Sequence, residues 1–537
     1  MFFLIYLTNP FNPQGPKRFF LRRKNESLRE IAFKELVQSK ETIVSYHLEN
    51  LFLVMSSNGY LCRGLDLIDV CQAYKLLYGR PFKGKMGDEP WNIWCLIRKQ
   101  KDDLKYIKEI RECIYGIKTL QEKELLKRID IFFSLLEQLW QQAIKQLKKT
   151  DEYDRYIKLE KPVNEMLLEK HLDGIKISQQ RLRGRLDVLD KKISTTSRSL
   201  KEEYGIRDLS NPGEIVSVLH KYGVEVLSDQ KKHLEDTLDF YAEQLRLPRL
   251  LKLYRDSKRD KDILLRLGGI NAARIHPVYK CFGTVTGRIL IESPSLQNLK
   301  RENRDIIEPD VGKIFLYPDY SQFEPGIMAS EAQDKILIND FNNGDLYVSL
   351  SVKLFGDLKC RRLAKLLFLA FCYGMTMERM AQILIHSNSE SLGEKEKVIR
   401  NFFGRYQRLI KWKTSIESEL LRNKKIGTVL GNYRYRDCRG KQLSYFEKRW
   451  VISQRIQGTA SVILKEVILR IKRELTDVDI LIPMHDALLV QVPIDKAQRL
   501  QGDIEQIFKN EFIKVCPVIK PRISFSPFVE NKESEKL

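Results

Sequence analysis

No stretch of this sequence is apolar for long enough to cross a membrane. The opening MFFLIYL is apolar for only seven residues, and no basic residue precedes it as in a signal peptide, so we expect a buried strand there. The nine cysteines are dispersed and no two stand at a C-x-x-C spacing, so neither a zinc site nor a redox motif is indicated. An odd number of scattered cysteines fits a reducing, intracellular compartment.

The composition describes a globular chain with a large basic excess. At 537 residues the chain is too long for one core, which predicts two or three domains. Hydrophobic residues make up 43% and charged residues 31%, and this balance excludes a disordered chain. The net charge of +22 favours a polyanionic partner, because each neutralised phosphate releases counterions. A basic protein without a nucleic-acid partner is the alternative.

The sequence changes character along its length. Residues 1–75 mix short apolar runs with turn residues, which predicts strands together with helices. From about 97 to 149 apolar residues recur at spacings of three and four, as on the core-facing side of a long helix. Residues 163–260 look helical and highly charged, which fits either a solvated helix face or an arm along a phosphate backbone. The predicted core-facing residues are Ile129, Phe132, Leu135, Leu136, Leu139, Trp140, Ala143 and Leu147.

Two aspartates follow apolar runs in the C-terminal half. The run Ile314–Tyr317 predicts a buried strand that brings Asp319 to its end. In ILIPMHDALLVQV the apolar run breaks at His485 and Asp486 and then resumes, which predicts a hairpin with an acid at its tip. Two aspartates on neighbouring strand ends could hold two divalent cations about 4 Å apart, as phosphoryl transfer requires. The alternative is that each is an ordinary turn aspartate.

A basic helix is predicted between these two acidic segments, over RRLAKLLFLAFCYGM. Arg361, Lys365, Leu369 and Tyr373 are spaced by four and so form one ridge roughly 18 Å long. That length matches an extended nucleoside triphosphate, with cations for the phosphates and an aromatic ring for the base. The alternative is an amphipathic helix with a basic first turn. Cations in a first turn oppose the helix macrodipole, so Arg361 needs an anion nearby.

At these residues the chain resembles the family A DNA polymerases, the relatives of bacterial DNA polymerase I, over about residues 157–537. DYSQFE is similar to the first catalytic motif of that family. The resemblance implies that Asp319 and the backbone of Tyr320 bind metal, and that Gln322 belongs to the nucleotide-binding set. Glu324 would lie against the sugar 2′ position and exclude ribonucleotides.

RRLAK with the following YG resembles the nucleotide-binding helix of the family. The resemblance implies that Arg361 and Lys365 contact the triphosphate and that Tyr373 packs near the templating base. It also implies that Lys365 is catalytic together with Asp319 and Asp486. Leu369 would face the nucleotide from the same ridge. Tyr347 occupies a position near the incoming phosphates that relatives often give to histidine.

MHDALLVQV resembles the last catalytic motif, which places His485 near the primer end and makes Asp486 the second metal ligand. CFGTVTGRI with SLQNL is similar to the segment that grips the primer–template duplex. There Arg288 would contact minor-groove acceptors, which every base pair offers. RWVISQRIQGTA resembles the helix before the last motif and brings in Arg449 and Gln457. The implied DNA-binding set also contains Gln297 and Asn298.

The sequence departs from the family pattern at several positions. Leu369 and Ala370 stand where relatives usually have Phe-Gly or Tyr-Gly, which puts discrimination at the sugar in doubt. Ala487 replaces the glutamate that usually follows the second aspartate, which removes an auxiliary carboxylate. Because the main acidic pair and the cations remain, we expect a divergent but active enzyme whose unusual behaviour lies in nucleotide selection.

The N-terminal region has a faint similarity to the 3′–5′ exonuclease domain that often precedes such polymerases. FLIYLTNP stands where a strand with an Asp-x-Glu pair is expected, and it has no carboxylate. SYHLENL falls at a second acidic motif, Asp69 survives in a third segment, and no Tyr-x-x-x-Asp motif follows. Two-metal hydrolysis needs several carboxylates together, so we expect a remnant without proofreading activity. An unrelated helical cap is the alternative.

The resemblance implies a mixed α+β fold, a right hand of palm, fingers and thumb preceded by an α/β exonuclease-like remnant. Glu324 favours deoxynucleotides and argues against the alternative of a single-subunit RNA polymerase. The expected domains are residues 1–155 for the remnant and 156–537 for the polymerase, with the thumb at about 163–262, the fingers at about 341–429, and the palm at about 263–340 and 430–537.

The expected activity is DNA-directed synthesis, in which dNTPs are added to a primer 3′ end with two Mg²⁺ ions and without proofreading. The expected partners are primer–template DNA, dNTPs and accessory replication or repair factors, with no membrane. We expect a monomer in the cytoplasm or nucleoid, and the sequence leaves an organelle open. A catalytically inactive nucleic-acid-binding protein is one alternative, and a repair, lesion-bypass or RNA-templated polymerase is another.

Overall fold

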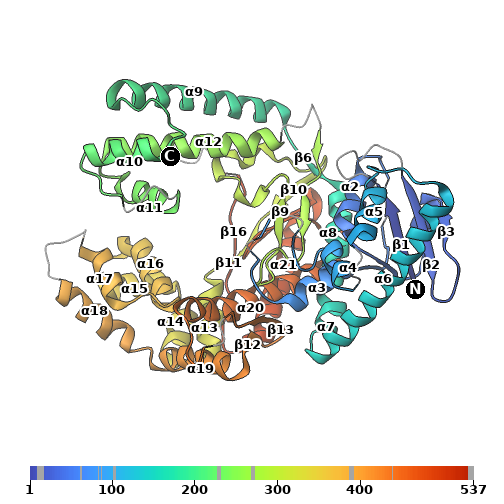
Figure 1. Cartoon of the computed structure of the whole chain (residues 1–537). Helices are drawn as coiled ribbons and strands as arrows, with labels where there is room; N and C mark the ends of the chain where they lie inside the picture. The colour runs from blue at the N-terminus through green and yellow to red at the C-terminus, as the bar shows by residue number, and fades with distance from the viewer. Residues whose placement is uncertain are drawn as a thin grey trace. The chain divides into compact units, whose positions relative to one another are not determined.

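The structure is a computed structural model of the whole chain (Figure 1). It describes all residues except 9–16, 61–62, 83, 86–87, 101–103, 227–230, 268–272, 386–391, 438–439 and 530–537. Within the described residues, no helix combines the length and apolar character needed to cross a bilayer. The backbone divides into two compact units. The first contains Met1–Asp173, Val278–Leu290 and Gly312–Ser526, and the second contains Gly174–Pro277, Ile291–Val311 and Pro527–Leu537.

The N-terminal part of the first unit is built on a mixed sheet with the strand order β3-β2-β1-β4-β5. Strand β1 pairs antiparallel with β2 and parallel with β4. All six residues of β1 are buried, which confirms the strand expected from the opening apolar run. The strands are β1 (Phe2–Leu7), β2 (Arg18–Arg23), β3 (Arg29–Ile31), β4 (Ile43–Ser45) and β5 (Leu67–Asp69).

Helices cover this sheet, and the longest is α6 (Glu122–Lys149). Every residue of the predicted core-facing stripe on α6 is buried, from Ile129 to Leu147. The prediction from the apolar spacing is therefore confirmed. After α6 the chain runs through a buried π-helical turn, η1 (Tyr156–Glu160), into α8. The remaining helices here are α1 (Phe33–Val37), α2 (Leu48–Ser56), α3 (Val70–Tyr78), α4 (Ile93–Gln100), α5 (Leu104–Ile114), α7 (Tyr153–Arg155) and α8 (Lys161–Asp173).

A three-stranded antiparallel sheet, in the order β10-β15-β14, contains the hairpin of the second acidic motif, and its β10 precedes the first acidic motif in the sequence. The predicted hairpin is present, because β14 and β15 pair around a tip at 484–487. The apolar run before Asp319 is less buried than expected, and it ends at Leu316 instead of Tyr317. Asp319 lies in a separate short strand, β11. The elements are β10 (Lys313–Leu316), β11 (Pro318–Tyr320), β14 (Asp479–Pro483), β15 (Leu488–Pro493) and β16 (Ile523–Phe525), with α13 (Phe323–Ala332), α20 (Tyr445–Glu474), η5 (Ile494–Lys496) and α21 (Ala497–Val515).

A helical region, with the predicted basic helix as α16, follows α13. Helix α16 ends at Cys372, and Tyr373 is its C-cap. The elements are α14 (Lys335–Asn342), α15 (Leu346–Phe355), η4 (Leu358–Cys360), α16 (Arg361–Cys372), α17 (Met377–Ile385), α18 (Leu392–Gly404), α19 (Gln407–Asn423) and the hairpin strands β12 (Lys425–Thr428) and β13 (Gly431–Tyr435).

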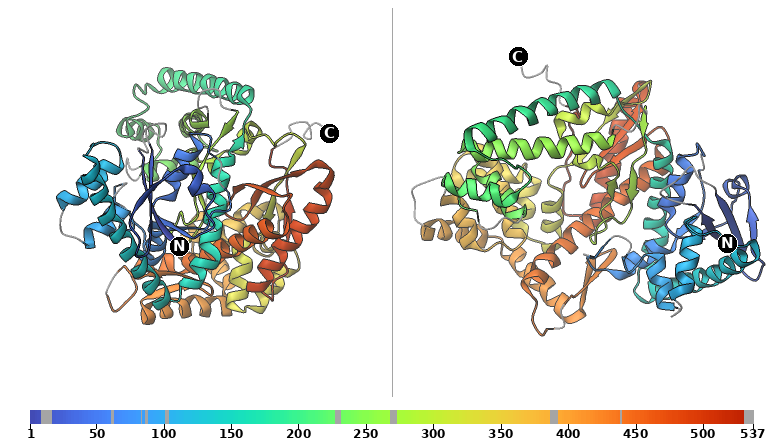
Figure 2. Two further views of the ribbon diagram at one scale, coloured as in Figure 1. Left: turned by 90° about the vertical axis from the view of Figure 1, so that its right-hand side faces the viewer. Right: turned by 45° about the horizontal axis from the view of Figure 1, so that its top comes forward.

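The second unit is largely helical, and its long helices α9 and α12 pack side by side (Figure 2). Helix α9 begins with Ser178, whose hydroxyl accepts a bond from the Arg181 N–H, and ends at Gly205 in the left-handed conformation. Its elements are β6 (Ile175–Lys176), α9 (Gln179–Tyr204), α10 (Pro212–Lys221), α11 (Lys231–Tyr241), α12 (Arg246–Leu267), β7 (Arg274–Ile275), η2 (Leu296–Asn298) and η3 (Arg301–Ile306). Strands β8 (Val278–Lys280) and β9 (Leu290–Glu292) stand at the joins of the two units in the sequence.

Candidate active site

The two aspartates of the acidic motifs come from adjacent backbone segments. Asp319 in β11 forms an antiparallel bridge with Ala487, the residue after Asp486. The Tyr320 N–H donates to the Asp486 carbonyl oxygen at 3.0 Å. The Tyr320 side chain joins β11 to α21, because its hydroxyl donates to the Phe508 carbonyl at 2.6 Å. The structure therefore places the backbone of Asp319 beside that of Asp486, although the two residues lie far apart in the sequence.

Charged side chains act electrostatically on Asp486 and His485 at the tip of the β14–β15 hairpin. Asp486 reaches solvent, yet the surrounding protein desolvates its carboxyl group and raises its pKa. His485 in its protonated form, Arg288 and Lys365 act in the opposite direction, since a positive charge favours the carboxylate. The pKa of His485 is lowered by burial and by Arg288. Predicted residues from a loop, a helix and a hairpin thus act electrostatically on one another.

The carboxylates suit a pair of Mg²⁺ ions. Among the described residues, no group of three or more His, Cys, Asp or Glu side chains has the arrangement of a metal site. Mg²⁺ requires fewer protein ligands, because it keeps water and takes substrate phosphate oxygens. Asp319 and Asp486, on paired backbone segments, supply hard oxygen ligands of the kind this ion prefers.

The basic ridge of α16 meets an anion that the sequence did not reveal. The Arg361 guanidinium donates to the Asp345 carboxylate at 2.6 and 3.1 Å. Asp345 also caps α15, because it accepts from the Tyr347 and Val348 N–H groups. Burial alone would raise the pKa of Asp345, but Arg361 and these N–H groups hold it below its usual range. An aspartate directly before a helical run indicates an N-cap, so the cap at Asp345 could be predicted from the sequence. Its pairing with Arg361 could not.

Tyr347 lies under both cations of the ridge. The Arg361 guanidinium carbon and the Lys365 ammonium lie 5.6 and 5.7 Å from its ring centroid. Both distances fall within the range of a cation–π contact. Tyr347 is buried, and burial raises the pKa of its hydroxyl. The aromatic ring thus supports two cations at the position where relatives often have histidine.

Glu324 links the far end of the ridge to the predicted duplex-gripping loop. The Tyr373 hydroxyl donates to one Glu324 oxygen, and Arg288 donates to the other at 2.7 Å. Burial and the Glu324 charge raise the pKa of Tyr373, and a hydrogen bond to Gln457 opposes that rise. Gln322 contacts the start of α15, where its side-chain oxygen accepts the Leu346 N–H.

The structure does not bring every predicted residue into this group. Arg449 is exposed on α20, with its guanidinium over the Tyr445 ring. Gln297 accepts the Ile291 N–H, and Asn298 donates to the Ser295 hydroxyl within the second unit. Leu369 is half-buried on α16. These residues remain predictions for DNA and nucleotide contacts.

The predicted N-terminal acidic positions have a different geometry. One Asp69 oxygen accepts the Leu48 N–H at 2.8 Å, and the other accepts the Cys71 and Gln72 N–H groups at 2.8 and 3.2 Å. Burial raises the pKa of Asp69 to about 6. Glu49 pairs with Lys280 at 2.8 Å, and this ammonium outweighs burial to lower the Glu49 pKa.

Strand β1, in the segment where an Asp-x-Glu pair was expected, has a buried tyrosine, Tyr6. The Tyr6 hydroxyl donates to the carbonyl oxygens of Tyr46 and His47, at 3.0 and 2.9 Å. The two tyrosine rings stack with their centroids 5.1 Å apart. The end of this strand is therefore closed by packed aromatic side chains. Asn9 and Pro10 of the segment singled out in the sequence lie outside the described residues.

Comparison with known proteins identifies the family of the chain. The family model for DNA polymerase family A matches residues 179–522, more than half of the chain. The chain belongs to DNA polymerase family A. It is 26% identical over 399 residues to DNA polymerase I of Helicobacter pylori, which covers 70% of the chain and 44% of the relative. It is 23% identical over 367 residues to DNA polymerase I of Aquifex aeolicus, which covers 65% of the chain and 62% of that relative. The chain thus spans about half the length of the curated relatives it matches.

The fold extends the likeness beyond the family match. The polymerase domain of Pol1 from M. smegmatis, solved with DNA primer–template and dNTP, superposes with a TM-score of 0.75. The match covers 94% of this chain and 91% of that one, at 20% sequence identity. This chain therefore has the mixed, mostly helical fold of a family A polymerase domain, including most of its N-terminal region.

Proposed function

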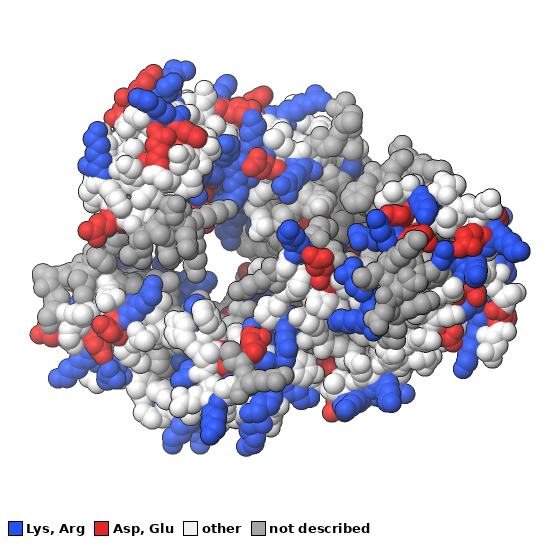
Figure 3. All heavy atoms as spheres, viewed as in Figure 1, with Lys and Arg blue, Asp and Glu red and all other residues white. Residues whose placement is uncertain are grey.

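We propose that the chain is a DNA-directed DNA polymerase that adds dNTPs to a primer 3′ end. The observation that carries the proposal is the pairing of Asp319 and Asp486 on adjacent backbone, with Lys365, Arg288 and His485 acting on Asp486. Primer–template DNA and dNTPs are the substrates. Their phosphates would account for the net charge of +22. On the face drawn in Figure 3, Lys and Arg are spread among Asp and Glu, so total charge alone does not mark the DNA path.

In this proposal Asp319, Asp486 and the Tyr320 backbone hold two Mg²⁺ ions. When bound, these ions stabilise charge on the attacking and leaving oxygens. The primer 3′-hydroxyl attacks the α-phosphorus of the dNTP, a new P–O bond forms, and the bond to the β-phosphate oxygen breaks. Pyrophosphate leaves, and the hydroxyl proton passes to solvent.

The residues of the chain bind and orient the reacting groups. Arg361 and Lys365 neutralise the triphosphate, and Arg361 exchanges Asp345 for phosphate when the nucleotide enters. Glu324 occupies the space beside the sugar, where a 2′-hydroxyl would meet a carboxylate already bonded to Tyr373 and Arg288. Closure around a correct base pair then aligns the hydroxyl with the phosphate before the reaction.

We further propose that the N-terminal region is an exonuclease-like remnant without proofreading activity. Its support is the environment of Asp69, whose two carboxylate oxygens are both engaged by backbone N–H groups. Three of the roughly four acceptor positions of this carboxylate are thus taken, and turning it toward a metal would break bonds that hold the starts of α2 and α3. Removal of a mispaired 3′ nucleotide by the pure protein, lost in Asp69→Asn, would contradict this proposal.

A catalytically inactive nucleic-acid-binding protein is the second candidate. The Arg361–Asp345 ion pair favours it, because the cation proposed for the triphosphate already has a partner. Primer extension with dNTPs or with rNTPs, on matched and mispaired primers, separates the candidates. Polymerase activity predicts dNTP-dependent extension that Asp319→Asn abolishes and Asp503→Asn, on an exposed turn of α21, leaves intact. DNA binding without extension would overturn the first proposal.

A further inference from the structure

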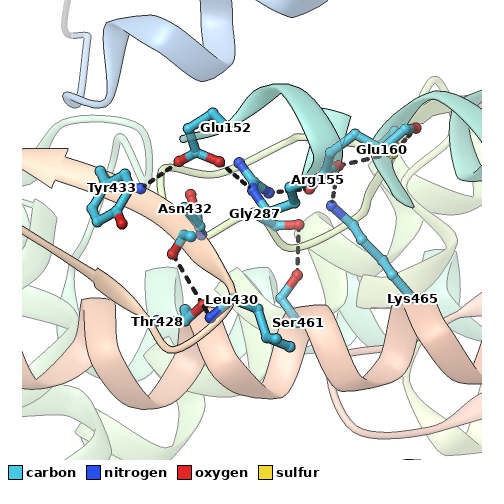
Figure 4. A network of polar contacts seen from close by, with 12 residues as sticks. Glu152, Arg155, Glu160, Gly287, Thr428, Leu430, Asn432, Tyr433, Ser461 and Lys465 are labelled. Atoms are coloured by element: carbon cyan, nitrogen blue, oxygen red, sulfur yellow. Dashed lines mark hydrogen bonds and ion pairs between the residues drawn. The ribbon is translucent and has the colours of Figure 1, made fainter. Parts of the chain in front are cut away.

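A buried ionic cluster lies beside the loop that carries Arg288. Glu160, only 1% exposed, forms ion pairs with Arg155 and with Lys465 of α20, the latter at 2.6 Å (Figure 4). The Cys281 thiol also contacts a Glu160 oxygen at 3.4 Å. Arg155 and Lys465 both face the Phe282 ring, at 5.8 and 5.4 Å from its centroid. The cluster therefore contacts the start of the loop at both Cys281 and Phe282.

The loop continues as a tight turn from Gly283 to Arg288. The Gly283 N–H donates to the Arg288 carbonyl, and the Gly287 N–H donates to the Thr284 carbonyl, both at 2.9 Å. Gly287 has φ of 81°, and a Cβ there would lie 3.1 Å from the Asn432 amide nitrogen and 3.2 Å from the Phe282 ring. The turn thus needs glycine both for its conformation and for its close packing.

Helix α20 holds the end of this turn. The Ser461 hydroxyl donates to the Gly287 carbonyl at 2.6 Å, one residue before Arg288 (Figure 4). Ser461 and Lys465 are four residues apart, so they lie on one face of the helix. One helix face therefore contacts the loop twice, through Lys465 near Phe282 and through Ser461 at Gly287.

The linker before α8 and the hairpin β12–β13 complete the support. Glu152 accepts the Tyr433 N–H at 3.0 Å and binds Arg155 at 2.6 Å. Gln454 donates to the Asn432 carbonyl at 2.7 Å and to the Val285 carbonyl at 3.4 Å. On another side Gly283, Thr284 and Val285 line a cavity of about 440 Å³. Part of the turn therefore faces a cavity. Its position depends on the opposite contacts, which come from Ser461 and Gln454 of α20.

Stability alone is a weak reason for such a cluster. Replacing a buried ion pair by apolar side chains of similar size is often neutral or stabilising, because charges are costly to desolvate. Ionic partners with fixed geometry do, however, select one arrangement of the segments they join. The segments joined here meet beside Arg288, whose guanidinium reaches Glu324 at 2.7 Å.

We propose that Glu160, Lys465 and Ser461 are positioning residues that hold the turn Gly283–Arg288 so that Arg288 reaches the minor groove at the primer terminus. The proposal rests on the proposed function, since it requires a primer–template substrate. Ser461 acts through the Gly287 carbonyl, and Glu160 and Lys465 act through Phe282 and Cys281. None of the three touches the substrate.

The experiment measures kcat/KM for primers that end in a purine or in its 3-deaza analogue, which lacks the minor-groove acceptor. The ratio of the two values reports the Arg288 contact. For the wild-type chain we expect a ratio of about ten or more, the effect of losing one hydrogen bond to a charged group. Arg288→Ala should bring the ratio close to one.

Ser461→Ala and Lys465→Met should each lower the ratio severalfold, and Ser461→Thr, which keeps the hydroxyl, should restore it. The matched control is Ser418→Ala, which removes an exposed serine hydroxyl bonded within α19. Each variant is first checked for a cooperative thermal transition. If Lys465→Met does not fold, Ser461→Ala decides the question alone.

Equal loss on both primers, with the wild-type ratio retained in Ser461→Ala, would mean a structural role only and would overturn the inference. A wild-type ratio near one would also overturn it, while leaving the polymerase proposal intact. Absence of any extension by the wild-type chain would instead contradict the proposed function, and the inference with it.

Discussion

Asp69 and Asp486 are both desolvated aspartates next to strands of the first unit, yet they differ in what their oxygens contact. Asp69 ends β5, and three backbone N–H groups occupy its two oxygens. Asp486 stands at the tip of a hairpin, paired through backbone with the β11 strand of Asp319 and facing Arg288 and Lys365. An aspartate at a strand end is therefore a better candidate ligand when backbone N–H groups have not already taken most of its acceptor positions.

The same distinction applies to their electrostatics. Burial raises the pKa of both carboxyl groups, to about 6 for Asp69 and in the same direction for Asp486. Around Asp486 the opposing influences are the side chains of His485, Arg288 and Lys365 together with one backbone hydrogen bond of its own. Around Asp69 they are only backbone N–H groups, which belong to the starts of α2 and α3. A raised pKa alone thus does not identify a catalytic carboxylate.

The largest expected effect is on primer extension, when either proposed metal-binding aspartate is replaced. Asp319→Asn or Asp486→Asn should reduce primer extension by roughly 10³-fold or more, because each loses the charge that holds a divalent ion. Binding of primer–template, followed by fluorescence anisotropy, should remain. Near-normal extension by either variant would show that these two carboxylates are no more catalytic than Asp69.

The next effect concerns Glu324, a carboxylate bonded to side chains rather than to backbone. Glu324→Ala should raise the efficiency of rNTP use relative to dNTP use by about tenfold, because the space beside the sugar opens. The readout is the ratio of kcat/KM values for matched rNTP and dNTP. An unchanged ratio would place sugar discrimination at another residue.

A smaller effect is expected from the ion pair of Asp345. Asp345→Asn keeps an oxygen to cap α15 but releases Arg361 for phosphate. We expect the KM for dNTP to fall about two- to fivefold, the scale of a partly exposed ion pair. Arg361→Ala is the opposing control and should raise KM. A higher KM in Asp345→Asn would mean that the pair helps to hold Arg361 in its working position.

The smallest effect on synthesis is expected at Asp69. Asp69→Asn should leave primer extension unchanged. It should lower stability, because at least one backbone N–H loses its acceptor, and it should remove a pH dependence of stability. The folded state holds the Asp69 proton up to a pKa of about 6, against an ordinary value of 3.8. The stability that this proton contributes is present at low pH and is lost as pH rises from about 4 to about 6.

Urea unfolding of both proteins across this pH window provides the measurement. The free energy of unfolding of the wild-type chain should decline relative to that of Asp69→Asn as pH rises, and the difference should level off above the folded pKa. Parallel curves would show that Asp69 is not desolvated as described. A loss of extension in Asp69→Asn would connect the N-terminal region to synthesis.

Local pattern predicted the frame of the site well. The hairpin around Asp486, the helix with the Arg361 ridge and the buried stripe of α6 are all present, because each depends on spacings within one element. The bonds that define the site could not be predicted in the same way. Arg361 pairs with a residue 16 positions away, Arg288 with one 36 away, and Tyr373 with one 49 away.

The sequence by itself determined the chemistry that the chain can offer: two aspartates after apolar runs, a four-residue ridge of cations and an aromatic ring, and a first strand without carboxylates. These follow from residue types and periodicity, which act over a few residues. Only the tertiary structure decided which carboxylates are already engaged. Asp69 accepts bonds from backbone N–H groups, whereas cationic side chains act on Asp486 through their charge. That difference depends on the segments that packing places beside each strand end.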